Sequence, residues 1–252
     1  MHTDVTGLRD FYQGPLGLVV RRVLSQKIRS LWPRPSGCTL IGYGFATPFL
    51  GSFRGEAQRL GALMPVVQGA LVWPSADRNM AVLVQEDFLP LPDNSVDRML
   101  LVHGLEFAER PALLLREIWR VLAAEGRIIV VVPNRTGVWA RTDRTPFGQG
   151  RPYSSQQIDH ILREAMLTPL RWESALYIPP VGGSLVLRSA PTLERLGRRL
   201  SRHIAGVIVV EAGKEMVAPI GIKSRSAARI RVEVPMPVPT QGRVRPDDEI
   251  PN

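Results

Sequence analysis

Residues 85–97 read Gln-Glu-Asp-Phe-Leu-Pro-Leu-Pro-Asp-Asn-Ser-Val-Asp and lead into a short apolar run. The turn-forming residues 92–95 are typical of the start of a strand. Residues 109–123 then carry apolar side chains at helical spacing, and Gly126 precedes a second apolar run over 128–132. A turn, a strand, a helix and a buried strand in this order predict a parallel sheet with helices on both faces.

The residues upstream continue this alternation. Short apolar strands are predicted over residues 38–41, 62–64 and 81–84. The first of them runs straight into Gly42-Tyr43-Gly44, and a helix is expected to begin near Pro48 because proline is favoured in a first helical turn. Residues 8–31 have apolar side chains at nearly helical spacing, which predicts a leading helix that Gly14-Pro15 interrupts near its start.

The pattern changes downstream of Pro133. Residues 134–153 read as a long loop, and Ser154 or Ser155 is a good N-cap for a helix that ends near Ala165. Further strands are expected over 168–177 and 204–211. We therefore predict one domain over residues 1–223, with a leading helix at 8–31, a core at 36–177 and 204–214, and a Pro-rich, disordered tail at 224–252.

Composition narrows the class of protein. The 252 residues are 44% hydrophobic, but the longest apolar runs are strand-sized, so we expect no membrane span. The first residues do not form a secretory signal, and the single cysteine, Cys38, excludes a disulfide framework. No spacing of His, Asp or Glu predicts a metal site. These features together predict a cytoplasmic protein.

The net charge of +9 raises nucleic acid as a partner. However, the basic residues are spread along the chain, apart from one arginine cluster between residues 188 and 202, which a solvated helix face also explains. Aromatic residues do not alternate with basic ones there, as they do in proteins that bind single strands. RNA binding is therefore the weakest of three hypotheses about function.

The stretch 85–97, the pattern Glu117-x-x-Arg120-Val-Leu and the strand after Gly126 resemble class I S-adenosylmethionine-dependent methyltransferases, specifically the type 11 methyltransferase domain. The resemblance covers residues 36–135. It implies a Rossmann-like, seven-stranded α/β sandwich, with a loop insertion after the fifth strand. It also implies methyl transfer from S-adenosylmethionine to a small-molecule or protein acceptor.

The resemblance further implies a cofactor site at the carboxyl ends of the strands, where a glycine-rich turn allows close approach of the backbone. The residues placed there are Gly42, Tyr43, Gly44, Ala46, Met64, Gln85, Glu86 and His103. Leu40, Met64 and Gln85 stand where the family usually has acids. Loss of these charged acceptors predicts that cofactor binding is weak or lost.

His103 follows the fourth strand and is the candidate catalytic base, because the pKa of an imidazole lies near working pH. The alternative is a histidine at the start of a helix. Tyr12, Glu106, Trp139 and Tyr153 are candidate substrate contacts, together with Phe147, although aromatic loop residues also serve simply to seat a loop. Asp97 and Arg120 are expected to be structural.

The flanks at 10–17 and 133–154 are similar to those of a bacterial branch of type 11 methyltransferase-like proteins. Members of that branch are often encoded beside a hydroxyacylglutathione hydrolase of the glyoxalase II type. The alternative to an enzyme is therefore a weak or inactive protein of the same fold that forms a hetero-oligomer, with this hydrolase as the candidate partner. The surface predicted for such a partner combines the arginine-rich segment 192–202 with the loop 135–153, including Arg141 and Trp139.

Overall fold

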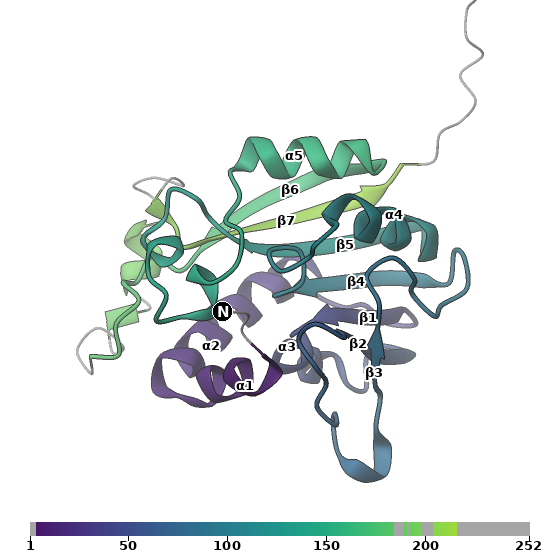
Figure 1. Ribbon diagram of the computed structural model, residues 1–252, viewed down its shortest axis with the longest axis horizontal. Coiled ribbons are helices and arrows are strands. Elements are labelled where there is room, and N and C mark those ends of the chain that lie inside the picture. Colours follow the sequence, from purple (N-terminus) through teal and green to yellow (C-terminus); the bar gives the residue numbers. More distant parts are fainter. Residues whose placement is uncertain (1–3, 184–188, 191, 198–203, 216–252) are drawn as a thin grey trace, which may run out of the picture. The chain divides into compact units, whose positions relative to one another are not determined.

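A computed structural model describes residues 4–183, 189–190, 192–197 and 204–215. In this part of the chain seven strands form one sheet in the order β3-β2-β1-β4-β5-β7-β6 (Figure 1). The strands are β1 (Thr39–Gly44), β2 (Arg59–Pro65), β3 (Ala81–Val84), β4 (Val96–Val102), β5 (Leu122–Pro133), β6 (Leu167–Ala175) and β7 (Val207–Lys214). Strands β1 to β5 are parallel, whereas β7 is antiparallel to both β5 and β6. The expected Rossmann-like methyltransferase sandwich is confirmed.

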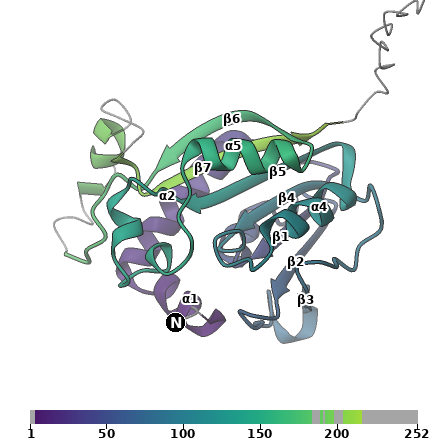
Figure 2. The same cartoon turned by 45° about the horizontal axis from the view of Figure 1, so that its top comes forward.

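Helices cover both faces of this sheet, as Figure 2 shows. They are α1 (Val5–Gln13), α2 (Pro15–Leu31), α3 (Thr47–Leu50), α4 (Pro111–Val121) and α5 (Ser155–Glu164). Successive strand residues alternate between two cores: Leu100 packs with residues of α1, α2 and α3, whereas Met99 and Leu101 pack with residues of α4 and α5. Alternation of side chains along a strand thus gives each face its own apolar layer.

The leading helix is divided where the sequence predicts it. Gly14 ends α1, its amide donates to the Asp10 and Phe11 carbonyls, and Pro15 begins α2. Proline suits this position because it lacks the amide hydrogen that a first helical turn leaves unpaired. The helical segment starts at Val5 rather than Leu8, since the Asp4 side chain accepts a hydrogen bond from the Gly7 amide and caps it.

The stretch 85–97 is held by the helix that follows it. The Glu117 carboxylate accepts from the Leu89 amide at 3.0 Å, and the Arg120 guanidinium donates to the Leu89 and Leu91 carbonyls at 2.9 and 3.0 Å. Arg120 also pairs with Glu117 and with Asp93. These bonds clamp the loop before β4, so the expected structural role of Arg120 is confirmed.

Asp97 is structural as well, because its carboxylate accepts from the Thr39 amide at 2.8 Å and fixes the start of β1. The predicted N-cap of α5 is also confirmed: Ser154 forms a capping box with Gln157. Other boundaries differ. Residues 42–44 lie within β1, the helix that contains Pro48 begins at Thr47 and has only four residues, and β5 begins at Leu122, before Gly126.

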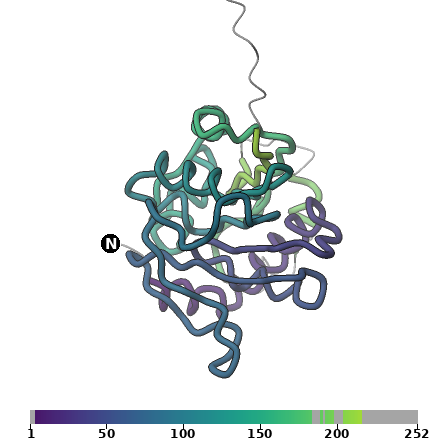
Figure 3. The backbone as a smooth tube through the Cα atoms, turned by 90° about the vertical axis from the view of Figure 1, so that its right-hand side faces the viewer, coloured from purple at the N-terminus to yellow at the C-terminus, as the bar shows by residue number. Residues whose placement is uncertain are grey.

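The segment 66–80 between β2 and β3 projects at the β3 edge of the sheet (Figures 1 and 3).

Among the described helices, none has both the length and the apolar character that a transmembrane span requires. The described residues also contain no group of His, Cys, Asp or Glu that could hold a metal ion. The predicted tail at 224–252 and, apart from Arg195, the arginine cluster lie outside the described residues.

Replacing Arg120 with glutamine is expected to lower the free energy of unfolding by about 1–3 kcal/mol, because two loop carbonyls and two carboxylates lose their donor. Urea unfolding measures this difference, and Arg116→Gln, an exposed change on the same helix, is the control. Arg120 lowers the pKa of Glu117 from its ordinary 4.5, so the stability from this pair is present above pH 4.5 and is lost as pH falls through the lowered value. A difference that stayed constant into acid would contradict the ion-pair explanation.

Candidate functional site

The site forms where β1 and β4 end side by side. Gly44 has a φ of 77°, and a Cβ there would lie 2.4 Å from the Val102 carbonyl oxygen and 2.9 Å from the His103 carbonyl carbon. The next residue, Phe45, donates its amide to the same Val102 carbonyl at 2.8 Å. Only glycine can approach the Val102 carbonyl this closely. The contact therefore also fixes the position of the His103 backbone, which directly follows Val102.

His103 lies at the centre of a buried hydrogen-bonded set. Its Nε2 is 2.9 Å from the Tyr12 hydroxyl, and its Nδ1 is 3.0 Å from Glu106 Oε1. A carboxylate only accepts, so in the neutral imidazole the proton lies on Nδ1 and Nε2 accepts from the Tyr12 hydroxyl. All three side chains are almost fully buried, and Glu106 Oε2 has no hydrogen-bond partner among the described residues.

The electrostatics of this set keep the tyrosine neutral. Burial, and then the charge of Glu106, raise the pKa of Tyr12 well above 10. The ring of Phe147 lies 4.7 Å from the His103 ring, which adds to the apolar surroundings. Tyr12 is therefore a hydrogen-bond donor to the imidazole rather than a phenolate.

His103 does not begin a helix, so the alternative role considered for it is wrong. Its φ is 50°, and α4 starts only at Pro111. A non-glycine residue in this conformation is uncommon and is held by its surroundings. The carbonyl of His103 accepts a hydrogen bond from the Gln68 side-chain amide, which fixes this backbone.

Gln68 connects the site to the start of α1. Its carbonyl accepts from the Val5 amide at 2.7 Å, and Tyr12 at the other end of α1 stacks on Phe45 at 5.7 Å. Sequence reasoning missed Gln68, because nothing in its local sequence distinguishes it from an ordinary loop residue. It also proposed Tyr12 and His103 separately, without a sign that they meet.

A cavity of about 310 Å³ lies beyond the ends of β2 and β3. It is lined by residues 65–67, 84–87, 109 and 110. Val66 and Val67 are 57% and 53% exposed there, although both are apolar. Gln85 and Glu86 both line this cavity, as the predicted adenine contacts should, but the Glu86 carboxylate already accepts from the Glu109 and Arg110 amides at 3.0 and 2.8 Å.

Of the three residues that stand where acids are expected, Leu40 and Met64 are buried, whereas Gln85 is exposed. Leu40 packs in the core, and Met64 lies at the end of β2, where its Sδ accepts from the Leu71 amide at 3.2 Å. Ala46 is buried against Gly42, whose missing Cβ makes room for it, and the Tyr43 side chain lies in the core on the opposite face. Of the proposed cofactor residues in β1, Gly44 thus lies nearest to His103.

The other candidate substrate residues hold the loop after β5. Trp139 is fully buried and donates its indole N–H to the Ile178 carbonyl at 2.7 Å, while the Tyr153 hydroxyl donates to the Leu105 carbonyl at 3.3 Å. These contacts support the alternative that the aromatic residues seat the loop. The prediction that Trp139 belongs to an exposed partner surface is wrong, because the loop folds inward over it.

The chain was compared with known proteins. Residues 38–130 match a family model described as a methyltransferase domain. A search of curated proteins finds no match. The fold is similar to that of a structure from Thermotoga maritima, described as a possible histamine N-methyltransferase, with a TM-score of 0.61 at 17% identity over 84% of this chain and 96% of that chain.

Two further structures are similar. A putative methyltransferase from Haloferax volcanii, solved in complex with the Trm112 methyltransferase activator, has a TM-score of 0.58 at 20% identity, over 77% of this chain and 91% of that chain. The 1,6-didemethyltoxoflavin-N1-methyltransferase of Burkholderia thailandensis, solved with bound 1,6-didemethyltoxoflavin and S-adenosylhomocysteine, has a TM-score of 0.52 at 16% identity, over 82% of each chain. With the strand order, these similarities show that the chain has the class I S-adenosylmethionine-dependent methyltransferase fold, within which residues 38–130 match the methyltransferase domain model.

Proposed function

We propose that the chain is an S-adenosylmethionine-dependent methyltransferase that acts on a small-molecule or protein acceptor. The observation that carries this proposal is the cavity of about 310 Å³ beyond β2 and β3. In an open parallel sheet the ligand binds outside the carboxyl ends of the strands, near the point where strand order reverses. The cavity lies at this end of the sheet.

The cavity fits the adenine end of the cofactor. Val66 and Val67 expose apolar surface that a flat ring would cover, and Gln85 offers an amide that can both donate to and accept from a base. The Burkholderia relative binds S-adenosylhomocysteine within the same fold. Residues 65–67 and 85–86 are therefore the ones that would hold the adenine.

Two of the usual carboxylates are missing. Met64 stands where the resemblance implies an acid for the ribose hydroxyls, and Leu40 stands where it implies an acid that orients the loop and holds the amino group of the cofactor. Both residues are apolar and buried, and each missing charge-assisted hydrogen bond costs about 1.5–3 kcal/mol of binding free energy. We therefore expect weak binding.

The cofactor supplies a methyl group bound to a positively charged sulfur, and the protein has to accept the proton that the methyl group replaces. His103 is our candidate base, with Glu106 accepting a hydrogen bond from Nδ1. Its Nε2 lies 2.9 Å from the Tyr12 hydroxyl, so a proton from the acceptor would reach Nε2 through that hydroxyl, which gives its own proton to Nε2 and takes one from the acceptor. Glu106 is a positioning residue, since it acts through the imidazole.

Calorimetric titration of the full chain with S-adenosylmethionine is expected to show saturable binding. The change Val67→Asp is expected to weaken binding at least tenfold, because it places a charge where the ring would lie. Val138→Asp is the matched control, since Val138 is 49% exposed and does not line this cavity. Equal weakening by both variants would contradict adenine binding at this position.

The alternative hypothesis is a methyltransferase-fold protein that binds a protein partner without transferring methyl groups. The buried Leu40 and Met64 favour it, and the Haloferax relative forms a complex with an activator protein. If no heat is observed with millimolar cofactor, this alternative replaces the enzyme. Co-purification with a hydroxyacylglutathione hydrolase would then test the partner that the flanking sequences imply.

Tyr12→Phe is expected to lower the free energy of unfolding by about 1–2 kcal/mol, because Nε2 of buried His103 loses its donor. In the native protein Tyr12 should stay neutral above pH 10, since burial raises its pKa. The contribution of the protonated Tyr12 hydroxyl to the free energy of unfolding is fully present below pH 10. It is lost as the pH rises through the pKa of Tyr12 in the folded protein. Urea unfolding of the parent and of Y12F measures the difference in stability. Tyrosinate absorbance of the native and unfolded protein, compared between the parent and Y12F, measures the titration of Tyr12. A Tyr12 that titrates normally in the native protein would contradict the buried set.

A further inference from the structure

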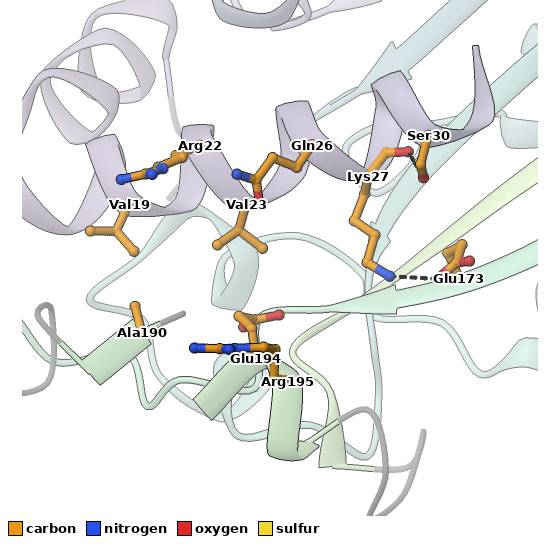
Figure 4. A pocket seen from close by; sticks show the side chains of 10 residues that line it. All are labelled: Val19, Arg22, Val23, Gln26, Lys27, Ser30, Glu173, Ala190, Glu194 and Arg195. Carbon is orange, nitrogen blue, oxygen red and sulfur yellow. Dashed lines mark hydrogen bonds and ion pairs between the residues drawn. The ribbon is translucent and has the colours of Figure 1, made fainter. Parts of the chain in front are cut away.

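A second cavity, of about 500 Å³, lies along helix α2, separate from the site around His103. Figure 4 shows that α2 forms one wall, that Glu173 of β6 lies at one end, and that Ala190, Glu194 and Arg195 lie on the opposite wall. The volume is within the range of small-molecule sites in proteins. None of its lining residues belongs to the proposed cofactor or acceptor site.

The α2 wall is formed by side chains on the helix face that adjoins the buried face of α2. Val20, Leu24 and Ile28 face the core, whereas Val19 and Val23 are turned by part of a helical turn and stay partly exposed to the cavity. With Ala190 from the opposite wall they make one end of the cavity apolar (Figure 4). The apolar part of a ligand can bind there by displacing water.

The charged residues of the cavity lining are three basic ones, Arg22, Lys27 and Arg195, and two acids, and Arg22 lies beside Val19 (Figure 4). Glu173 pairs with Lys27 at 2.5 Å, and Glu194 accepts from the Tyr177 amide through Oε1 at 2.6 Å. Arg22 has no acidic partner among the described residues, and Arg195 adds a second guanidinium to the lining. An unpaired guanidinium beside an apolar wall favours a carboxylate, which it can bind with two parallel hydrogen bonds.

We propose that this cavity binds an organic carboxylate that carries a hydrocarbon chain. The carboxylate pairs with Arg22, and the hydrocarbon chain packs against Val19, Val23 and Ala190. The site does not depend on the methyltransferase activity, since it shares no residue with it. It gives the protein a second ligand, of a chemical class different from the cofactor.

The test is a calorimetric titration of the full chain with decanoate, with acetate and decylamine as comparison ligands. Decanoate is expected to bind, acetate not to bind because it lacks the hydrocarbon chain, and decylamine not to bind because its charge has the wrong sign. Arg22→Gln is expected to weaken decanoate binding at least tenfold, because it removes the charge-assisted hydrogen bonds between the guanidinium and the carboxylate. Arg116→Gln removes the same charge from the exposed face of α4 and should leave binding unchanged.

Each contrary result overturns the proposal. No saturable heat with decanoate would exclude the ligand class, and equal binding of decylamine would show that charge plays no part. Equal weakening by Arg22→Gln and Arg116→Gln would place the ligand elsewhere on the protein. Circular dichroism of each variant shows whether the fold is retained, and because no readout involves methyl transfer, failure here is distinct from failure of the proposed function.

Discussion

The close contact between the ends of β1 and β4 is the constraint on which the site depends. Gly44 passes so near Val102 that a side chain could not fit, and Phe45 bonds to the same carbonyl. This contact sets the direction in which the chain leaves β4. His103 consequently adopts a left-handed conformation and turns its ring into the interior, where Tyr12 and Glu106 meet it.

The elements of the sheet could be predicted because each carries a local signal. Alternation of strands and helices predicted the fold, and the clamp between residues 85–97 and Arg120 explains why that stretch has a recognisable pattern: its loop needs defined donors and acceptors. The cap at Ser154 and the break at Gly14 were predictable because capping and proline geometry act within a few residues. The short length of the helix that contains Pro48 could not be predicted in the same way, because tertiary packing limits that length.

The site itself could be predicted only in part. His103 and Glu106 are three residues apart, so their proximity was within reach of sequence reasoning, but Tyr12 is 91 residues from His103. Gln68 and Phe147 join the same cluster from two other loops. Such contacts depend on how loops cross at the end of a sheet, which no single segment encodes. The inward packing of Trp139 has the same cause.

The hydrogen bonds of α1 link the chemistry of a buried imidazole to a local unfolding equilibrium. This helix has nine residues and is attached to the rest of the molecule through Val5 at one end and Tyr12 at the other. Short helices open more readily than the strands of a central sheet. Each opening of α1 would expose Nε2 of His103 to water, so the fraction of time that the helix is docked sets how often the imidazole is in its buried, tyrosine-bonded form.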